Sequence, residues 1–174
     1  MERNELVRVD IFDNELGPIA KMEAHTEPIL HRAFSVYLIN KNKEMLIQKR
    51  ASHKYHSPDL WANSCCSHPR MGEDVVESAE KRMIEELGFT TKVKELFKFN
   101  YLCKFRKDLY EYEVDHVLLG EYNGSVVLNP EEASDYKWIS LDELSRDILE
   151  NPTKYSHWFI ISAPNVIEYI KNNC

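Results

Sequence analysis

The feature that most constrains the fold is one amphipathic helix, predicted over residues 74–87, with strand-like segments before and after it in the chain. Asp74 can cap this helix, Gly88 can end it, and apolar residues recur between them at helical spacing. The strand-like segments are residues 34–40, 45–50, 93–101, 110–119 and 136–139. Strands, hairpins and helices in this irregular order predict an α/β fold in which a mixed sheet is sandwiched between helices.

The spacing of apolar residues is less regular near the N-terminal end and just before the predicted helix. Val7, Val9 and Ile11 alternate as in a strand, and residues 13–18 then read as a turn. Residues 51–73 contain prolines and polar residues but few periodic apolar ones, so we expect a long irregular loop there.

Two helices are expected toward the C-terminal end. Residues 141–149 predict a short helix, and residues 156–172 predict a longer one, which Pro164 should kink or divide. No internal repeat, low-complexity tract or Gly/Ser/Pro linker interrupts the sequence, and 174 residues suffice for one domain with a real core. We therefore expect a single domain over residues 1–174.

Composition and charge argue against several classes of protein. Apolar residues make up 43% of the chain and charged residues 29%, and no apolar run approaches the ~20 residues that cross a bilayer. The stretch that begins with Glu2 and Arg3 has no apolar signal-peptide core, so we expect a cytoplasmic protein with no membrane partner. A net charge of −7 argues against nucleic-acid binding, but a phosphorylated substrate needs only local positive charge.

The four cysteines do not have the spacing of a disulfide framework or a zinc ribbon, because no CxxC occurs. Cys65 and Cys66 are adjacent in a polar loop beside His68, although cysteines are usually small buried hydrophobes. This setting favours a reactive thiol, and the sequence alone does not say which of the two carries it.

Three histidines and two glutamates are candidate metal ligands. His25, His31 and His68 are far apart in the chain, and a lone histidine is more often structural than a ligand. Glu111 and Glu113 are two residues apart on a predicted strand, so both side chains lie on one face. Either that face is simply solvated, or the repulsion of the carboxylates is relieved by a divalent cation such as Mg²⁺, Mn²⁺, Fe²⁺ or Zn²⁺.

A basic cluster lies close to the end of the second predicted strand. Lys49, Arg50 and Lys54 fall within six residues, and Lys21 and Arg82 can join them. Ordinary surface charge is one interpretation of these residues. The other is a diphosphate clamp in an otherwise acidic protein.

The end of the predicted helix also has two interpretations. Arg82 and Glu86 are four residues apart, as are Lys81 and Glu85, so both pairs can be ordinary ion pairs on a helix face. The same run, continued through Gly88, is the end of a Nudix box.

Over nearly its whole length, the chain resembles type I isopentenyl-diphosphate isomerase, a family with the Nudix-like fold. The segments that carry the resemblance are Glu23-Ala24-His25-Thr26, Leu30-His31-Arg32-Ala33-Phe34-Ser35, Asn63-Ser64-Cys65-Cys66-Ser67-His68-Pro69, Glu86-Leu87-Gly88 and Glu111-Tyr112-Glu113-Val114. Each segment alone is a weak signal, and their order and spacing together are specific.

The Nudix box of this chain is degenerate. Positions that match it are Glu73, Glu85, Glu86 and Gly88, and positions that depart from it are Ser67, Lys81 and Arg82. Nudix hydrolases place a glutamate where Arg82 stands and use it to hold the metals that activate water. The departure favours an isomerase over the alternative, a Nudix hydrolase of a nucleoside or prenyl diphosphate.

The resemblance implies an enzyme that interconverts isopentenyl and dimethylallyl diphosphate, using Mg²⁺ or Mn²⁺, with Zn²⁺ as an alternative at the His/Glu site, and neither flavin nor NAD(P)H. It implies one ion held by His25, His31, His68, Glu111 and Glu113, and a second Mg²⁺ on Glu86 at the substrate diphosphate. It implies that Cys66 and Glu113 exchange protons with the alkene, with help from Tyr101. Diphosphate binding would fall to Lys21, Arg50, Lys54 and Arg82, and Tyr101 and Trp158 would line the hydrocarbon end. Ser67 stands where the family usually has glycine.

Overall fold

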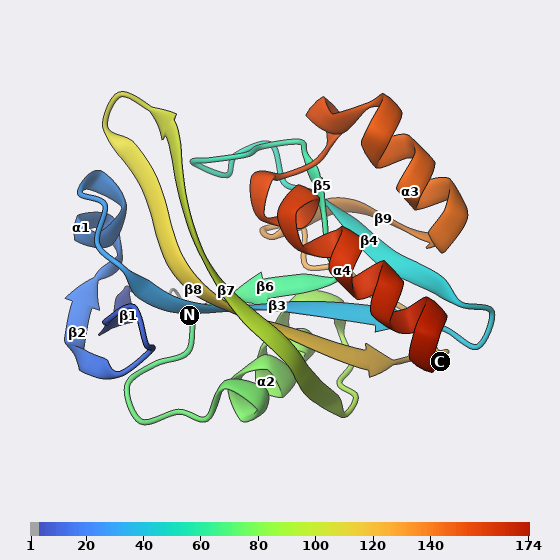
Figure 1. The fold of residues 1–174 in the computed structure, drawn as a ribbon, viewed down its shortest axis with the longest axis horizontal. Coiled ribbons are helices and arrows are strands. Elements are labelled where there is room, and N and C mark those ends of the chain that lie inside the picture. Colours follow the sequence, from blue (N-terminus) through green and yellow to red (C-terminus); the bar gives the residue numbers. More distant parts are fainter. Residues whose placement is uncertain (1–3) are drawn as a thin grey trace.

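The computed structural model describes residues 4–174, so Glu2 and Arg3, from the stretch without a signal-peptide core, lie outside the described residues. In the described part of the chain, nine strands form one curved mixed sheet, and helices lie against both faces (Figure 1). The strands are β1 (Glu5–Val9), β2 (Glu15–Ala20), β3 (His31–Ile39), β4 (Glu44–Arg50), β5 (Trp61–Ala62), β6 (Cys65–Ser67), β7 (Val93–Arg106), β8 (Leu109–Glu121) and β9 (Ala133–Ser140). The helices are α1 (Lys21–Thr26), α2 (Val75–Leu87), α3 (Leu141–Glu150), the short 3₁₀ helix η1 (Pro152–Lys154) and α4 (His157–Asn173). The predicted α/β class with a mixed sheet between helices is confirmed.

Strand β3 lies at the centre of the sheet. It pairs in parallel with β8 and antiparallel with β1, β4 and β6. Phe34, Val36 and Leu38 pack on the α2 side, while Tyr37 and Ile39 pack on the α4 side. Because both faces of the strand are covered, its sequence is a continuous apolar run rather than a clean alternation.

Helix α2 forms where its local signals predicted. The Asp74 carboxylate accepts hydrogen bonds from the backbone N–H groups of Val76 and Glu77, and Gly88 ends the helix with a left-handed φ of 76°. Its apolar face packs against the sheet, and this buried face also carries an acidic residue, Glu86, which is only 3% exposed. A carboxylate is rarely buried without a partner, so Glu86 marks the end of α2 as a polar site.

The expected irregular loop over residues 51–73 is partly wrong, because it contains β5 and β6. Strand β5 pairs with β4, and β6 pairs with β3 through Phe34, Ser35 and Val36. Both strands are too short to show a period, and they are held by partners distant in the sequence. Strand β6 places the two adjacent cysteines in the sheet.

Pro164 was expected to kink or divide the last helix, and the expectation of a division is wrong because α4 continues through Pro164. A proline removes one backbone hydrogen bond of a helix. Here its ring is exposed, and the neighbouring turns are fixed by buried residues such as Phe159, Ala163 and Val166. None of the helices in the described residues is both long and apolar enough to cross a bilayer.

The N-terminal prediction needs two corrections. Ile11 is not part of the first strand; it lies in the turn after β1 and is 61% exposed. Residues 15–18, expected in a turn, belong to β2, and Pro18 is tolerated there because β2 is an edge strand. The short helix α1, which has too few residues for a helical pattern, was not predicted.

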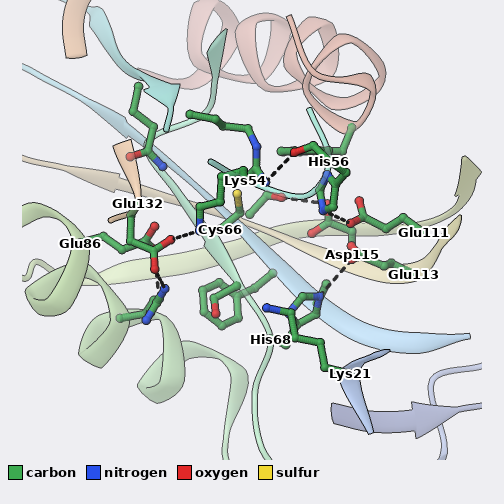
Figure 2. Close-up of a pocket in the computed structure, with 18 of the residues that line it drawn as sticks. Lys21, Lys54, His56, Cys66, His68, Glu86, Glu111, Glu113, Asp115 and Glu132 are labelled. Atoms are coloured by element: carbon green, nitrogen blue, oxygen red, sulfur yellow. Dashed lines mark hydrogen bonds and ion pairs between the residues drawn. The ribbon is translucent and has the colours of Figure 1, made fainter. Parts of the chain in front are cut away.

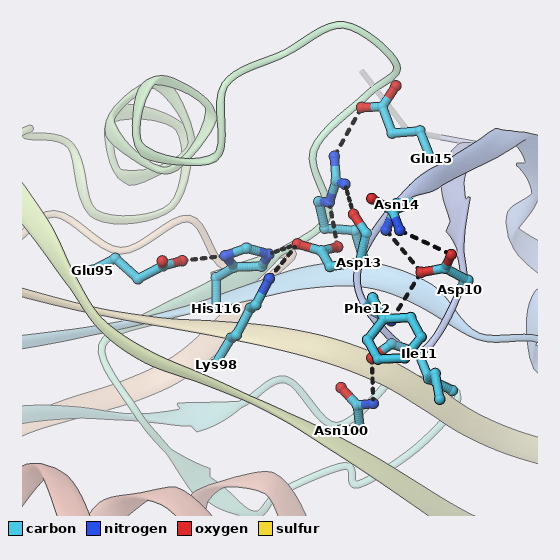
Figure 3. A network of polar contacts seen from close by, with 11 residues as sticks. Asp10, Ile11, Phe12, Asp13, Asn14, Glu15, Glu95, Lys98, Asn100 and His116 are labelled. Carbon is cyan, nitrogen blue, oxygen red and sulfur yellow. Dashed lines mark hydrogen bonds and ion pairs between the residues drawn. The ribbon is translucent and has the colours of Figure 1, made fainter.

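A polar network anchors the β1–β2 turn to the rest of the sheet (Figure 3). The Asp13 carboxylate accepts a 2.8 Å hydrogen bond from Arg32 Nε on β3 and lies 2.7 Å from His116 Nε2 on β8. The other ring nitrogen of His116 contacts Glu95 on β7. This network holds the N-terminal hairpin against β3 and β8 and so helps to place α1, which follows directly.

Candidate active site

A polar pocket, here called the central pocket, opens where β3, β6 and β8 meet the end of α2 and the loop after β4 (Figure 2). Its lining residues are Lys21, Ala33, Phe34, Ser35, Gln48, Arg50, Lys54, Tyr55, His56, Cys66, Ser67, His68, Arg82, Glu86, Glu111, Glu113, Asp115, Glu132 and Trp158. This set brings together the predicted diphosphate-binding cations, Cys66, Trp158 and the carboxylates of β8.

The predicted metal ligands converge at one end of this pocket. One donor atom from each of His25, His31, His68 and Glu113 lies within 4.8 Å of the others, and a second such group joins His25 with His56 and Glu111. His31 and Glu113 are direct neighbours in the parallel β3–β8 register. The far end of the long β7–β8 hairpin lies beside α1, which brings the β8 carboxylates to His25 (Figure 1).

Two buried imidazole nitrogens in this group fit a divalent cation. His25 Nδ1 lies 2.6 Å from the Lys21 carbonyl and His31 Nδ1 lies 2.9 Å from the Ile29 carbonyl, so in both rings this nitrogen carries the hydrogen. The Nε2 atoms of both rings are buried and make no hydrogen bond within residues 4–174. Burial and then the charge of His68 lower the pKa of His25 to about 3, so its ring is neutral and its lone pair is free. Neutral imidazoles next to carboxylates are the donors that Mn²⁺, Zn²⁺ and Mg²⁺ sites use.

The carboxylates of β8 differ in their affinity for protons. Burial raises the pKa of Glu113, but the imidazoles of His31 and His68, which lie 3.4 and 3.1 Å from its carboxylate, outweigh it and hold that pKa well below its usual range. Burial and then the charge of Glu113 raise the pKa of Asp115 well above normal, and Asp115 accepts a 2.8 Å hydrogen bond from Ser35. The pocket therefore favours the ionised form of Glu113 and the protonated form of Asp115.

The two cysteines of β6 face opposite sides of the sheet, as neighbours in a strand must. Cys65 is completely buried against α2 and donates to Glu86 at 2.7 Å, whereas Cys66 lines the central pocket. Burial raises the pKa of the Cys66 thiol, and nearby Arg50 only partly offsets this. At neutral pH, Cys66 is therefore a protonated thiol, suited to give a proton rather than to attack as a thiolate.

Two cations of the pocket, Arg82 and Lys54, already have carboxylate partners. Arg82 donates to Glu85 at 2.6 Å and to Glu132 at 2.7 Å, and its Nε lies 3.2 Å from Glu86. Lys54 also donates to Glu132, so this one carboxylate joins two of the predicted diphosphate-binding residues (Figure 2). Glu132 precedes β9 and matches no motif, so nothing in the sequence marked it.

Trp158 and Tyr101 were both expected near the hydrocarbon end, and only Trp158 lines the central pocket. Its ring lies 5.1 Å from the guanidinium carbon of Arg50, and its Nε1 donates to Asn63 at 2.9 Å. Tyr101 lies opposite Glu113 in the β7–β8 register and packs in the apolar core on the α4 side. Its hydroxyl is buried and makes no hydrogen bond in the part of the chain that the structure describes.

Comparison with known proteins agrees with this geometry. Residues 29–159 match the NUDIX domain family. The Isopentenyl-diphosphate Delta-isomerase 2 of Aromatoleum aromaticum is 42% identical over 164 residues, covering 94% of this chain and 87% of that protein. The protein of the same name from Photorhabdus laumondii is 43% identical over 154 residues, covering 88% of this chain and 87% of the relative. The chain belongs to the isopentenyl-diphosphate Delta-isomerase family. Solved structures of more distant proteins have the same Nudix fold, and this likeness supports the fold alone.

Two of these structures superpose over most of the isomerase-family chain. A protein of Deinococcus radiodurans gives a TM-score of 0.72 at 19% identity, covering 94% of this chain and 97% of its own. The MutT protein of Methanosarcina mazei gives 0.65 at 16% identity, covering 83% and 96%. Both superpositions support the Nudix fold of this chain.

The residues that line the isomerase-family site and were not predicted from the sequence include Asp115, His56 and Glu132. Asp115 continues the period-two pattern of Glu111 and Glu113, and that alternation was a signal that could have identified it. His56 and Glu132 lie in loops, where no period relates them to other site residues. Only the tertiary structure brings them to the pocket.

Proposed function

We propose that the central pocket interconverts isopentenyl diphosphate and dimethylallyl diphosphate by protonating and deprotonating the alkene. The observation that carries the proposal is the presence in one pocket of a protonated thiol, Cys66, and an ionised carboxylate, Glu113. The proposed partner is a small prenyl diphosphate in the cytoplasm, rather than nucleic acid or a membrane.

The reaction moves a double bond by one carbon, so it needs an acid and a base. In the forward direction, Cys66 gives its proton to the terminal methylene, and the π electrons form the new C–H bond. The tertiary carbocation that results loses a proton from the allylic carbon to Glu113, and the electrons of that C–H bond form the new double bond. We assign Tyr101, which lies opposite Glu113 in the sheet, to assist this proton movement.

The His/Glu group is the proposed site of a divalent cation. The residues that would hold it are His25, His31, His68, Glu111 and Glu113, and we propose Mg²⁺ or Mn²⁺ as the ion, with Zn²⁺ as the alternative at this site. When bound, such an ion would orient Glu113 and tune its proton affinity. No flavin or nicotinamide is required, because the reaction has no net oxidation.

The diphosphate is proposed to bind at the opposite side of the pocket. Arg82 and Lys54 face one another across Glu132, and Lys21 and Arg50 also line the pocket. Glu86 is the proposed ligand for a second Mg²⁺ that would neutralise diphosphate charge. These contacts would fix the alkene between acid and base, which is how binding energy lowers the barrier of such a step.

Trp158 is proposed to cover the reacting carbons. It is 4% exposed, so the wall that it forms is dry. The π face of a tryptophan stabilises a desolvated cation by about 2 kcal/mol or more. Exclusion of water also protects the carbocation from being trapped as an alcohol.

The alternative is a Nudix hydrolase, and the position of Arg82 disfavours it. A hydrolase carries a carboxylate there, whereas this chain carries a guanidinium 3.2 Å from Glu86, which leaves the site one metal-binding carboxylate fewer. The test is incubation of the purified protein with isopentenyl diphosphate and Mg²⁺ or Mn²⁺, without flavin or NADPH, followed by separation of the products. Dimethylallyl diphosphate is expected, while phosphate release without the isomer supports the hydrolase. A non-catalytic metal-binding domain would give neither product.

A further inference from the structure

His56 is a buried histidine between the metal-ligand group and Trp158. Its Nε2 lies 3.1 Å from Glu111 Oε2, and its side chain is 7% exposed. Its ring stacks on Phe105 with centroids 4.5 Å apart and meets the Trp158 ring edge-on at 5.8 Å. These aromatic contacts fix the ring and aim one nitrogen at a carboxylate of the proposed cation site (Figure 2).

The two groups of possible metal ligands share His25, so they can form one cation site but not two. His25 Nδ1 is engaged with the Lys21 carbonyl, which leaves Nε2 as its single free donor. One lone pair can bind one ion. Glu111 therefore belongs to the same cation site as His31, His68 and Glu113, and His56 lies beside that site.

The contacts of His56 indicate a hydrogen-bond donor. The Ser57 hydroxyl lies 3.4 Å from Nδ1 and can donate to it, which leaves the ring hydrogen on Nε2. An Nε2–H group here faces Glu111 Oε2 at 3.1 Å, within reach of a hydrogen bond, and has no lone pair for a metal. We propose that His56 is a positioning residue, whose hydrogen bond to Oε2 of Glu111 leaves the other carboxylate oxygen free for the ion. This inference rests on the divalent-cation site of the proposed function.

The proposal is tested by titrating Mn²⁺ into the substrate-free protein and its variants, with calorimetry as the readout. His56→Ala removes the hydrogen bond, and His56→Phe removes it while keeping an aromatic ring against Phe105 and Trp158. Both should bind Mn²⁺ about 10-fold to 100-fold more weakly, the usual effect of losing a residue that orients a ligand. His56→Gln keeps an N–H donor and should bind nearly as tightly as the wild type.

His53 in the same loop offers a matched control. Its side chain is 58% exposed and faces Glu131, which is 80% exposed, so His53→Ala should leave Mn²⁺ affinity unchanged. Melting temperatures without metal separate packing from metal binding, because His56→Phe should melt close to the wild type while still binding Mn²⁺ weakly.

Several outcomes would overturn the role of His56. Wild-type affinity in His56→Ala and His56→Phe would mean that the hydrogen bond does not matter. A loss in His56→Gln as large as in His56→Ala would mean that His56 is itself a ligand. Because the titration contains no substrate, it separates this inference from the proposed function. If the His56 variants bind Mn²⁺ more weakly but the wild-type protein does not convert isopentenyl diphosphate, the result counts against the proposed function and leaves the role of His56 intact.

Discussion

The two adjacent cysteines allow a sharp test, because β6 sends them to opposite sides of the sheet. Cys66→Ala removes the proposed acid from the central pocket. Loss of a positioned proton donor typically costs on the order of 100-fold or more in rate, so kcat should fall by at least that factor. The fold should be little affected, because Cys66 is partly exposed to the pocket.

Cys65→Ala is the matched control one residue away. It removes the 2.7 Å contact with Glu86 and a few atoms from the core. One lost hydrogen bond to a charged group and a small cavity should lower the free energy of unfolding by about 1–3 kcal/mol. In a chain of this size that corresponds to a decrease in Tm of about 2–4 °C for each kcal/mol. Turnover should change little, because Arg82 Nε still lies 3.2 Å from Glu86.

The assay measures kcat with isopentenyl diphosphate and the melting curve of each variant. The expected result is a split: Cys66→Ala loses turnover and keeps its Tm, while Cys65→Ala loses stability and keeps turnover. If Cys65 proves essential and Cys66 dispensable, the assignment of the acid is off by one residue and the mechanism is wrong.

Three further predictions concern charge. Arg82→Glu and Arg82→Ala should raise KM by on the order of 10-fold or more, because a charge-assisted contact with the diphosphate is lost. Neither variant should hydrolyse the substrate efficiently. Unchanged kcat and KM in both variants would place Arg82 outside the site. Asp13→Asn should lower the free energy of unfolding by about 1–3 kcal/mol at pH 7. Burial raises the pKa of Asp13, but Arg32 and the other partners of Asp13 hold that pKa below the usual 3.8. The stability difference between the wild type and Asp13→Asn should therefore persist at pH 5 and shrink near pH 3. Denaturant unfolding curves at these pH values measure the difference, and a difference that does not change with pH would contradict the prediction. Removal of bound metal with a chelator should lower activity and Tm together, because the ligands come from distant segments, and loss of activity with no change in Tm would contradict that site.

The parts of the fold that the sequence predicted best are those with local causes. Helix α2 has its own cap at Asp74, its own terminator at Gly88 and a regular apolar face, so its bounds are nearly as expected. Strand β6 has none of these, because only its pairing with β3 holds it extended. Pro164 shows the reverse error, since tertiary packing keeps a helix continuous through a residue that locally disfavours it.

In the candidate site, too, local sequence patterns predicted some features, while others depend on the tertiary structure. Residue type and spacing single out His25, His31 and Glu113 as possible ligands, but those patterns alone do not bring them together. The resemblance to a family supplied that expectation, and the register of β3 with β8 explains it physically. His56 and Glu132 escaped because their contacts with Glu111 and Arg82 depend on how loops fold over the sheet.

The most direct test of the central claim is turnover of isopentenyl diphosphate in D₂O, with the product identified by NMR. The Cys66 thiol exchanges its hydrogen with solvent, so protonation of the terminal methylene should place one deuterium in a methyl group of dimethylallyl diphosphate. An isomer without solvent deuterium would contradict the acid–base mechanism. Phosphate release with no isomer would contradict the proposed function itself.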